Sequence, residues 1–199
     1  MEKAEVRREV ARRVASLTPG QRAEKDSQIA RTFLSLPEFR SAQNILMYAS
    51  MDDEINMAPI ATAALDGGKR IYYPITIRGT RSIEIAEVED IRSDLAMGSF
   101  GIREPRTRDR ASPRDLDLLL IPGRAFDLGG NRLGRGAAYY DIFLGSSELS
   151  APRCALAYDC QVMDNIPHTE TDERIDILVT ESRVLRFDRG KRGSQHKTG

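Results

Sequence analysis

The stretch LDLLLIPGRAFDLGGNRLGRGAAYYD, residues 116–141, decides the fold of this chain. Its apolar start, Leu116 to Ile121, is a short and nearly continuous run that predicts a strand covered on both faces. Glycines recur between Gly123 and Gly136, and the residues from Ala137 onward are compatible with a helix. A strand, a glycine-rich loop and a helix in this order indicate an α/β fold.

The second half of this stretch, Gly129 to Asp141, is predicted to bind phosphate as it leads into the helix. Glycines let backbone amides approach an anion, and the start of a helix presents N–H groups and the positive end of the helix dipole. Arg132 and Arg135 add permanently charged forks that suit phosphate oxygens, and Asp141 lies one turn later, in position for a magnesium ion. The alternatives are a tight turn without a ligand, and an Asp141 that pairs with an arginine.

Other apolar runs predict the rest of a parallel sheet, because they lack the alternation of strands with one wet face. The runs are residues 45–48, 70–73 and 175–179. Between the first two runs, Asn56 can cap a helix over residues 57–65 that Gly67 ends, which makes a βαβ unit. Residues 83–88 do alternate, so they predict an edge strand, and a long polar surface loop follows them.

Two helices are predicted before the sheet. Valines recur at helical spacing from Val6 to Val14, and the other faces of this segment carry lysine and arginine, so the first helix is amphipathic and basic. The sequence TPGQ at residues 18–21 offers a capping hydroxyl, a proline at the first helical position and a glutamine three residues after the cap. A second helix should begin there, with Ile29 and Phe33 on its buried side.

Length and composition indicate one globular domain. A chain of 199 residues with 40% hydrophobic and 30% charged residues suits a single core, so we expect one domain over residues 1–188 and a disordered tail over 189–199. The 30 basic residues balance the 30 acidic ones, which gives no case for nucleic acid or an anionic membrane as a partner. With no signal peptide and no apolar run long enough for a membrane span, we expect a cytoplasmic protein, and a monomer.

Cysteine and histidine are too sparse for the common metal and relay sites. Cys154 and Cys160 have a spacing that fits no common zinc motif, so both are predicted to be free thiols. Of the two histidines, His196 lies in the predicted tail. A histidine-ligated metal or a Ser-His-Asp relay would therefore rest on His168 alone.

The loop sequence PGRAFDLGGNRLGRGAAYYD, residues 122–141, is similar to the signature of a known family, in which PG, FD, RLG and GYYD follow in this order. That family is the 5-formyltetrahydrofolate cyclo-ligases, which the chain resembles over nearly its whole length. The further matching positions are Lys3 and Arg7, SMDDEI at 50–55, residues 67–74, GIREP at 101–105, Gln161, Pro167 and residues 172–181.

This resemblance implies a three-layer α/β/α sandwich with a mostly parallel central sheet. It also implies an ATP-dependent ligase that closes a ring, with magnesium as cofactor and with ATP and a reduced folate as substrates. The formyl oxygen of 5-formyltetrahydrofolate would be phosphorylated, and a neighbouring nitrogen would then attack. The products would be 5,10-methenyltetrahydrofolate, ADP and phosphate. Such chemistry needs mainly positioning and charge stabilisation, which a chain poor in histidine can supply.

The resemblance also implies roles for single residues, and each role has a structural alternative. Without the family match, Lys3 and Arg7 would be solvated surface and Glu54 an ordinary loop acid, while Tyr139 with Tyr140 would be core rings. Phe100 would be an anchor for its own loop. The implied nucleotide-binding residues are Lys3, Arg7, Arg132, Gly134, Arg135, Gly136 and Tyr140. The implied substrate-binding residues are Ala49, Met51, Glu54, Phe100 and Tyr139; the catalytic ones are Arg132, Arg135 and Tyr139; the metal ligands are Asp141 and Asp172.

Three positions depart from the family pattern. Ala138 stands where relatives carry glycine, Ala137 where they carry glycine or lysine, and Ile142 where they carry a basic residue. If position 138 requires a positive φ, an alanine there costs on the order of 1 kcal/mol, whereas in a helical conformation it is tolerated. Two other functions therefore stay open: a diverged relative that binds nucleotide or folate in a regulatory or interaction role, with weak or no catalysis, and an ATP-dependent enzyme for another small substrate.

Overall fold

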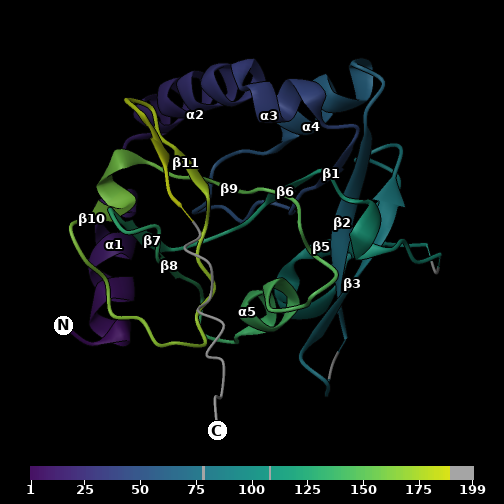
Figure 1. Ribbon diagram of the computed structural model, residues 1–199. Coiled ribbons are helices and arrows are strands. Elements are labelled where there is room, and N and C mark those ends of the chain that lie inside the picture. The colour runs from purple at the N-terminus through teal and green to yellow at the C-terminus, as the bar shows by residue number, and fades with distance from the viewer. Residues whose placement is uncertain (78, 108, 189–199) are drawn as a thin grey trace, which may run out of the picture.

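A seven-stranded sheet forms the centre of the computed structural model, which describes residues 1–77, 79–107 and 109–188. The predicted disordered tail, 189–199, lies outside the described residues. The strands of the sheet are β1 (Asn44–Leu46), β2 (Arg70–Ile77), β3 (Ser82–Val88), β6 (Leu118–Leu120), β9 (Arg153–Leu156), β11 (Ile177–Val179) and β12 (Val184–Arg186). Their spatial order is β12-β11-β9-β6-β1-β2-β3 (Figure 1).

Most neighbours in this sheet are parallel, as the sequence predicts. The five interior strands, in the order β11-β9-β6-β1-β2, are parallel to one another. The two edge strands are antiparallel: β12 pairs with β11, and β3 pairs with β2. The alternating run at 83–88 is therefore an edge strand, and the continuous apolar runs are the interior strands. The α/β fold class with a mostly parallel central sheet is confirmed.

Helices lie on both faces of the sheet. Along the chain they are α1 (Lys3–Ala15), α2 (Pro19–Ser35), α3 (Pro37–Ser41), α4 (Ala58–Asp66) and α5 (Tyr139–Leu144). Figure 1 shows α2, α3 and α4 over one face and α5 on the opposite face, while α1 stands near one end of the sheet. There α1 contacts a 3₁₀ turn, η3 (Asp159–Gln161).

The two faces of β6 illustrate why the run is continuously apolar. Leu118 and Leu120 join the core beneath the valines of α1 and the apolar sides of α2 and α4. Leu119 and Ile121 join the opposite core, together with Phe143 of α5. Because successive side chains of a strand point to opposite faces, a strand between two helical layers must be apolar at every position.

Local signals set the helix ends largely as predicted. Thr18 accepts from the backbone of Gln21 at 3.2 Å while the Gln21 side chain accepts from the backbone of Thr18 at 2.9 Å, which is a complete capping box. At the start of α4, the Asn56 side chain accepts from the backbone N–H of Ala58 at 3.1 Å. Gly68, at φ +72°, then ends that helix in a left-handed conformation.

The segment before α5 corrects one prediction. The residues after β6 do not run directly into a phosphate loop, because a small second sheet comes first, made of β7 (Ala125–Asp127), β8 (Arg132–Leu133) and β10 (Val162–Met163). The Asp127 carboxylate accepts from the backbone N–H groups of Gly129 and Asn131, each at 2.9 Å, so residues 129–131 form a hairpin turn. Only Gly134 to Ala138 are left as the loop proper, which we call the glycine loop.

The long polar segment after β3 is more ordered than the predicted surface loop. It contains a hairpin of β4 (Leu95–Met97) and β5 (Arg103–Pro105) around a 3₁₀ turn, η1 (Ser99–Gly101), and a second turn, η2 (Pro113–Asp115). Strand β5 contacts β2. The segment therefore covers the end of the sheet at which the candidate site lies.

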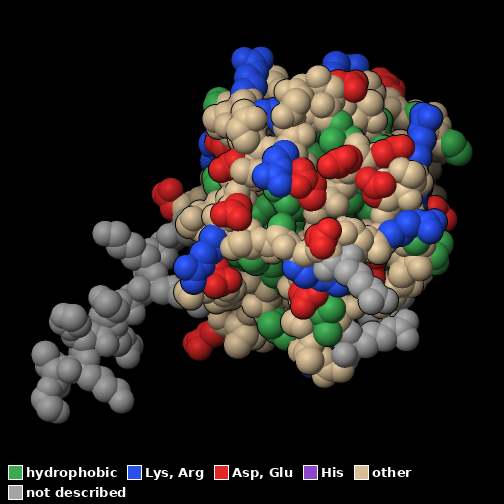
Figure 2. All heavy atoms as spheres, turned by 90° about the vertical axis from the view of Figure 1, so that its right-hand side faces the viewer, with side chains coloured by type: hydrophobic (Ala, Val, Ile, Leu, Met, Phe, Trp, Pro, Cys, Tyr) green, Lys and Arg blue, Asp and Glu red, His purple; other side chains and the backbone are tan. Residues whose placement is uncertain are grey.

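Charges of both signs mix on the face around β2 and β3, which Figure 2 shows. Arg70 pairs with Glu87 at 2.5 Å, and Arg110 pairs with Glu84. This mixture agrees with the formal net charge of zero. Within the described ranges, no helix has the length and apolar character that crossing a bilayer requires.

Candidate active site

A cavity of about 500 Å³ opens where β1 and β6 end. These neighbouring parallel strands run into Tyr48–Ala49 and Pro122–Gly123, which line the cavity beside residues from α1, β2, the glycine loop and α5. The carboxyl ends of parallel strands are the usual place for a ligand in open α/β sheets. The predicted site residues in its lining are Lys3, Arg7, Ala49, Glu54, Arg132, Gly134, Arg135, Gly136, Tyr139, Tyr140, Asp141 and Asp172.

One predicted substrate residue, Met51, does not line this cavity in the described structure, and a second, Phe100, is not tested. Met51 lies beside it, where its backbone N–H donates to Glu54 Oε2 at 3.0 Å, so it holds the acid in place. Phe100 belongs to η1, and its side chain lies outside the part of the chain that the structure describes.

The glycine loop meets α1 at the cavity wall. Arg7 Nε donates to the carbonyl oxygen of Gly134 at 2.8 Å. Gly136 has φ +109°, a conformation that favours glycine, and a β-carbon there would come within 3.4 Å of the Arg7 guanidinium. That distance is an ordinary van der Waals contact, so the positive φ, and not a lack of space, is what favours glycine at position 136.

Ala138, the last residue of the glycine loop, has the left-handed conformation with φ +60° and ψ +10°. It immediately precedes α5, so the chain turns into that helix through a residue with positive φ. The structure thus decides between the two conformations considered for this position: alanine stands where glycine would be relaxed. Ala137 is not among the residues with positive φ.

Arg135 is held between two acids of the segment after β1. Its Nη2 lies 2.8 Å from Glu54 Oε1 and 2.7 Å from Asp53 Oδ1. Arg124 donates to the other oxygen of Asp53. Burial alone would raise the pKa of the Asp53 carboxyl, but the hydrogen bonds from the two arginines outweigh it, so this pKa lies below its ordinary value. Asp53 thus stays a carboxylate, and together with Glu54 it fixes the loop arginine.

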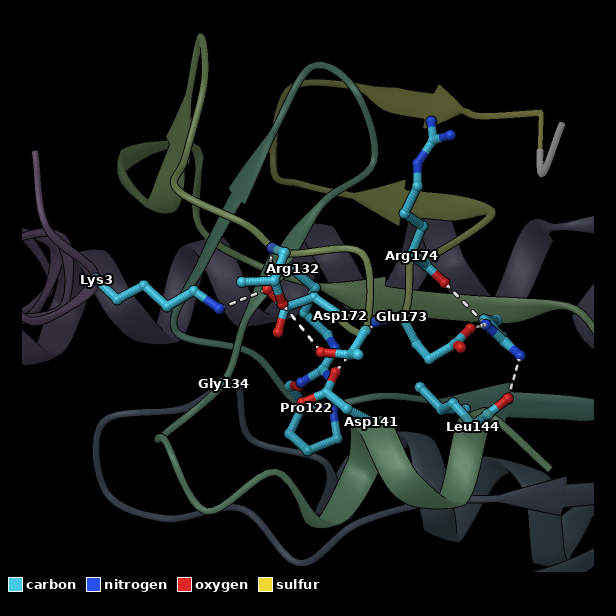
Figure 3. A network of polar contacts seen from close by, with 12 residues as sticks. Lys3, Pro122, Arg132, Gly134, Asp141, Leu144, Asp172, Glu173 and Arg174 are labelled. Atoms are coloured by element: carbon cyan, nitrogen blue, oxygen red, sulfur yellow. Dashed lines mark hydrogen bonds and ion pairs between the residues drawn. The ribbon is translucent and has the colours of Figure 1, made fainter. Parts of the chain in front are cut away.

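Arg132 is the buried cation of the site, with only 5% of its surface exposed. Its Nη2 donates to Asp141 Oδ1 at 2.5 Å, and its Nη1 donates to the carbonyl oxygen of Pro122 at 3.3 Å (Figure 3). Its Nε is buried and has no hydrogen-bond partner among the described residues. Asp141 therefore pairs with an arginine, as one of the two sequence-based alternatives states, and both hydrogen bonds that it accepts from the described residues go to Oδ1.

Lys3 brings α1 to the opposite side of the same cluster. Its Nζ lies 2.5 Å from Asp172 Oδ2 (Figure 3). Burial would raise the pKa of the Asp172 carboxyl, but the bond from Lys3 and one from the backbone of Thr169 outweigh it and lower this pKa. Asp172 and Asp141 belong to one network, because the backbone N–H of Glu173 donates to Asp141 Oδ1 at 3.2 Å.

These two carboxylates suit magnesium in one particular form. Magnesium keeps several waters and is usually held by one or two carboxylates together with substrate phosphates. Asp141 and Asp172 both line the cavity, next to the arginines that suit phosphate. In the described ranges, no group of three or more His, Cys, Asp or Glu side chains has the arrangement of a complete protein metal site. The residues therefore fit a metal that enters with a phosphate ligand.

Two tyrosines, Tyr48 and Tyr140, are among the residues that line the cavity. The Tyr140 hydroxyl is buried and has no hydrogen-bond partner among the described residues. Burial raises the pKa of Tyr140, and it raises the pKa of Tyr48 as well, so both side chains are neutral at physiological pH. Tyr48 was not predicted as a site residue; the only signal in the sequence was its place at the end of a buried apolar run.

The far end of the cavity is more apolar and also was not predicted residue by residue. Pro74 and Ile83 come from the paired strands β2 and β3, and Ile102 adjoins β5. Glu104 on β5 accepts from the backbone N–H of Thr76 at 3.3 Å, so its carboxylate is anchored in this wall. The stretch GIREP at 101–105 did signal this region, but the strand pairing that brings it to the cavity cannot be read from spacing.

The fold and the cavity together define a class: an α/β protein with a cavity at the carboxyl ends of its parallel strands, lined by arginines and glycines of a kind that suit an anionic ligand. Comparison with known proteins narrows this class. The family model described as the 5-formyltetrahydrofolate cyclo-ligase family matches residues 1–181. The chain therefore belongs to the 5-formyltetrahydrofolate cyclo-ligase family.

Individual relatives agree with this assignment. The 5-formyltetrahydrofolate cyclo-ligase of Escherichia coli is 30% identical over 178 residues, covering 88% of this chain and 98% of that protein. The enzyme of the same name from Haemophilus influenzae is 31% identical over 179 residues, covering 88% and 96%. Among solved structures, the 5,10-methenyltetrahydrofolate synthetase of Aquifex aeolicus superposes with a TM-score of 0.82 at 30% identity and covers 100% of both chains.

Proposed function

We propose that this protein catalyses the ATP-dependent conversion of 5-formyltetrahydrofolate to 5,10-methenyltetrahydrofolate. Family membership supports the activity. The observation that carries the proposal is the single cavity that brings Lys3 and Arg7 of α1, the glycine loop, Glu54 and Asp141 together from distant parts of the chain. Its volume of about 500 Å³ lies within the range of small-molecule sites.

The nucleotide end of the cavity is the cationic one. Arg132 precedes the glycine loop, Arg135 belongs to it, and Arg7 is held against Gly134 by its own hydrogen bond. These groups would bind the ATP phosphates and stabilise the charge that develops on the transferred group. Asp141 and Asp172 would hold a magnesium ion together with the phosphates, and that ion would neutralise phosphate charge.

The folate end lies between Glu54 and the apolar wall. Glu54 is held by Met51 and Arg135, so its carboxylate has a fixed place at the start of this region. Pro74 and Ile102 offer flat and branched apolar surface for the ring system, and Ala49 leaves room for it. Tyr139, at the junction of the two ends, would contact the formyl group as it meets the phosphate.

The chemistry has two steps, both of which depend on positioning. The formyl oxygen attacks the terminal phosphorus of ATP and ADP leaves, which turns a poor leaving oxygen into phosphate. The neighbouring nitrogen then attacks the formyl carbon and loses its proton as phosphate leaves, so the ring closes. Fixed arginines can stabilise both steps without a covalent intermediate on the protein.

The direct test mixes purified protein with 5-formyltetrahydrofolate and Mg-ATP and follows the rise of methenyl absorbance. We expect a rise that needs both substrates, with one ADP formed per methenyl product. Folate or nucleotide binding without turnover would favour a regulatory or interaction role, for which the strained Ala138 is the specific argument. ATP hydrolysis that depends on a different small acid would favour another substrate. The monomeric state and the cytoplasmic location stay predictions.

A further inference from the structure

A buried ion pair lies behind the cavity and does not belong to its lining. Arg153, at the start of β9, pairs with Glu173 at 2.7 Å, and the two residues have exposed fractions of only 5% and 7%. The other Arg153 nitrogen, Nη2, donates to the carbonyl oxygen of Leu144, the last residue of α5, at 2.5 Å. Figure 3 shows Leu144, at the end of α5, and the nearby segment that carries Glu173 and Arg174.

The same segment also holds the first turn of α5. The backbone N–H of Glu173 donates to Asp141 Oδ1 at 3.2 Å, and the same oxygen accepts from Arg132. Helix α5 is thus bound to residue 173 at both ends, through Asp141 at its start and through Arg153 and Leu144 at its end. We call the Arg153–Glu173 pair with its bond to Leu144 the α5 clamp.

Helix α5 needs such support because it is only six residues long. A helix of this length has no stability of its own, since most of its backbone groups lack partners within it. It also follows directly on the strained Ala138. Yet α5 carries Tyr139, Tyr140 and Asp141, all of which line the cavity.

Burying two charges is a costly way to join two segments. Desolvation offsets much of their attraction, and apolar residues of similar volume often stabilise a fold equally well. A buried arginine does make directional hydrogen bonds, however, because its planar guanidinium holds two acceptors in one fixed geometry. The clamp therefore suits a need for exact placement of α5 better than a need for stability.

We propose that Arg153 is a positioning residue for the reaction. It acts through α5 on the placement of Tyr139, Tyr140 and Asp141. This inference rests on the proposed function in its kinetic tests, whereas its hydrogen-exchange test does not depend on that function. In the described structure, the Arg153 guanidinium donates to Glu173, to the carbonyl oxygen of Arg174 and to that of Leu144, and none of these residues lines the cavity. Its contribution to the rate is therefore the placement of groups that do line the cavity.

The first test is the double variant Arg153→Met with Glu173→Met, which removes both charges and leaves no buried carboxylate without a partner. Because small misplacements of reacting groups are costly, we expect kcat to fall about 10- to 100-fold, with a smaller change in the KM for the folate. The matched control removes the ion pair of Arg186 with Glu38, which joins β12 to α3 away from the cavity, and should keep the wild-type rate. Equal rates in the clamp variant and the control would overturn the proposal.

The second test is a double-mutant cycle with Asp141→Asn. If Arg153 acts through Asp141, this substitution should lower kcat less in the clamp variant than in the wild type, because the carboxylate is already misplaced there. A merely structural role would give losses that multiply. Multiplying losses would therefore count against a positioning role even if the clamp variant is slow.

The third test does not depend on turnover. Hydrogen exchange of the backbone amides of residues 139–145 should be faster in the clamp variant, while the amides of β1 and β2 keep their protection. Arg153→Lys serves as a second variant. A lysine ammonium group keeps the positive charge beside Glu173, but it lacks the planar fork that lets arginine also donate to the carbonyl oxygen of Leu144. Faster exchange in α5 without any wild-type turnover would uphold the clamp and reject the proposed function. Unchanged exchange in both variants would overturn the clamp.

Discussion

Arg135 and Glu54 stand 81 residues apart in the sequence, yet their side chains meet at 2.8 Å across the mouth of one cavity. The contact joins the glycine loop to the segment after β1, and Asp53 adds a second carboxylate to the same guanidinium. Neither the sequence around Glu54 nor the sequence around Arg135 indicates by itself that these two side chains meet. The contact exists because β1 and β6 are neighbours in the sheet, so the segments after them leave the sheet side by side.

Removal of the Arg135 charge should damage catalysis much more than folding. With Arg135→Met we expect kcat/KM for ATP to fall on the order of 100-fold, because a fixed cation at the transferred phosphate is lost. Initial rates at several ATP concentrations measure this. The control is Arg114→Met, since the Arg114 side chain lies at the exposed surface, where it pairs with Glu148. Equal rates in both variants would show that Arg135 serves Glu54 and Asp53 alone.

Glu54 should affect the other substrate. Replacement Glu54→Gln removes a charged acceptor, so we expect the KM for 5-formyltetrahydrofolate to rise about tenfold while the KM for ATP changes little. Asp52→Asn, at an exposed neighbouring position, is the matched control. A rise confined to the KM for ATP would place Glu54 at the wrong end of the cavity.

Asp141 should set the requirement for magnesium. In Asp141→Asn the carboxylate is lost, and we expect the magnesium concentration for half-maximal rate to rise about 10- to 100-fold. Rates are followed in a magnesium titration at constant ATP, with Asp164→Asn at an exposed position as control. A lower rate at an unchanged magnesium requirement would mean that Asp141 acts only as the partner of Arg132.

The strain at Ala138 should be measurable as stability. Because φ is +60° there, Ala138→Gly should raise the free energy of unfolding by about 0.5 to 1 kcal/mol, the relief of strain exceeding the entropy that glycine adds to the unfolded chain. Thermal unfolding measures the change. Ala137→Gly should give no gain, since position 137 has no positive φ. Equal effects at both positions would contradict the conformation, and a faster rate in Ala138→Gly alone would show that strain also limits activity.

The Lys3–Asp172 pair should make stability depend on pH. The folded chain lowers the pKa of Asp172 below its ordinary value of 3.8, so the pair stabilises the fold above that pH and loses its effect as pH falls through the folded value. Lys3→Met should therefore lower the unfolding free energy at neutral pH by at most about 1 kcal/mol, and by less near pH 2. Denaturant unfolding at both pH values tests this. A difference that stays constant between them would show that lost packing, not charge, is responsible.

Much of the fold was open to prediction because its signals are local. The capping box at Thr18, the continuous apolar run at 118–121 and the alternating edge strand at 83–88 each depend on residues a few positions apart. Of the site residues that the family pattern predicted and whose side chains the structure describes, all but Met51 line the cavity, while their roles stay predictions. The prediction was wrong at the start of the phosphate loop. There the Asp127 carboxylate accepts hydrogen bonds from the backbone of Gly129 and Asn131, so these residues form a hairpin turn instead.

The sequence by itself determined the α/β class, the mostly parallel sheet and the family, because hydrophobic period, turn residues and a continuous motif are properties of neighbouring residues. Only the tertiary structure decided that Ala138 is left-handed, that Tyr48 and Glu104 line the cavity, and that Arg153 reaches the end of α5. Those facts depend on which strands become neighbours and on which buried charges meet. Packing between residues far apart in the sequence sets the strand order and the charge pairs, and the spacing of residues along the chain does not reveal this packing.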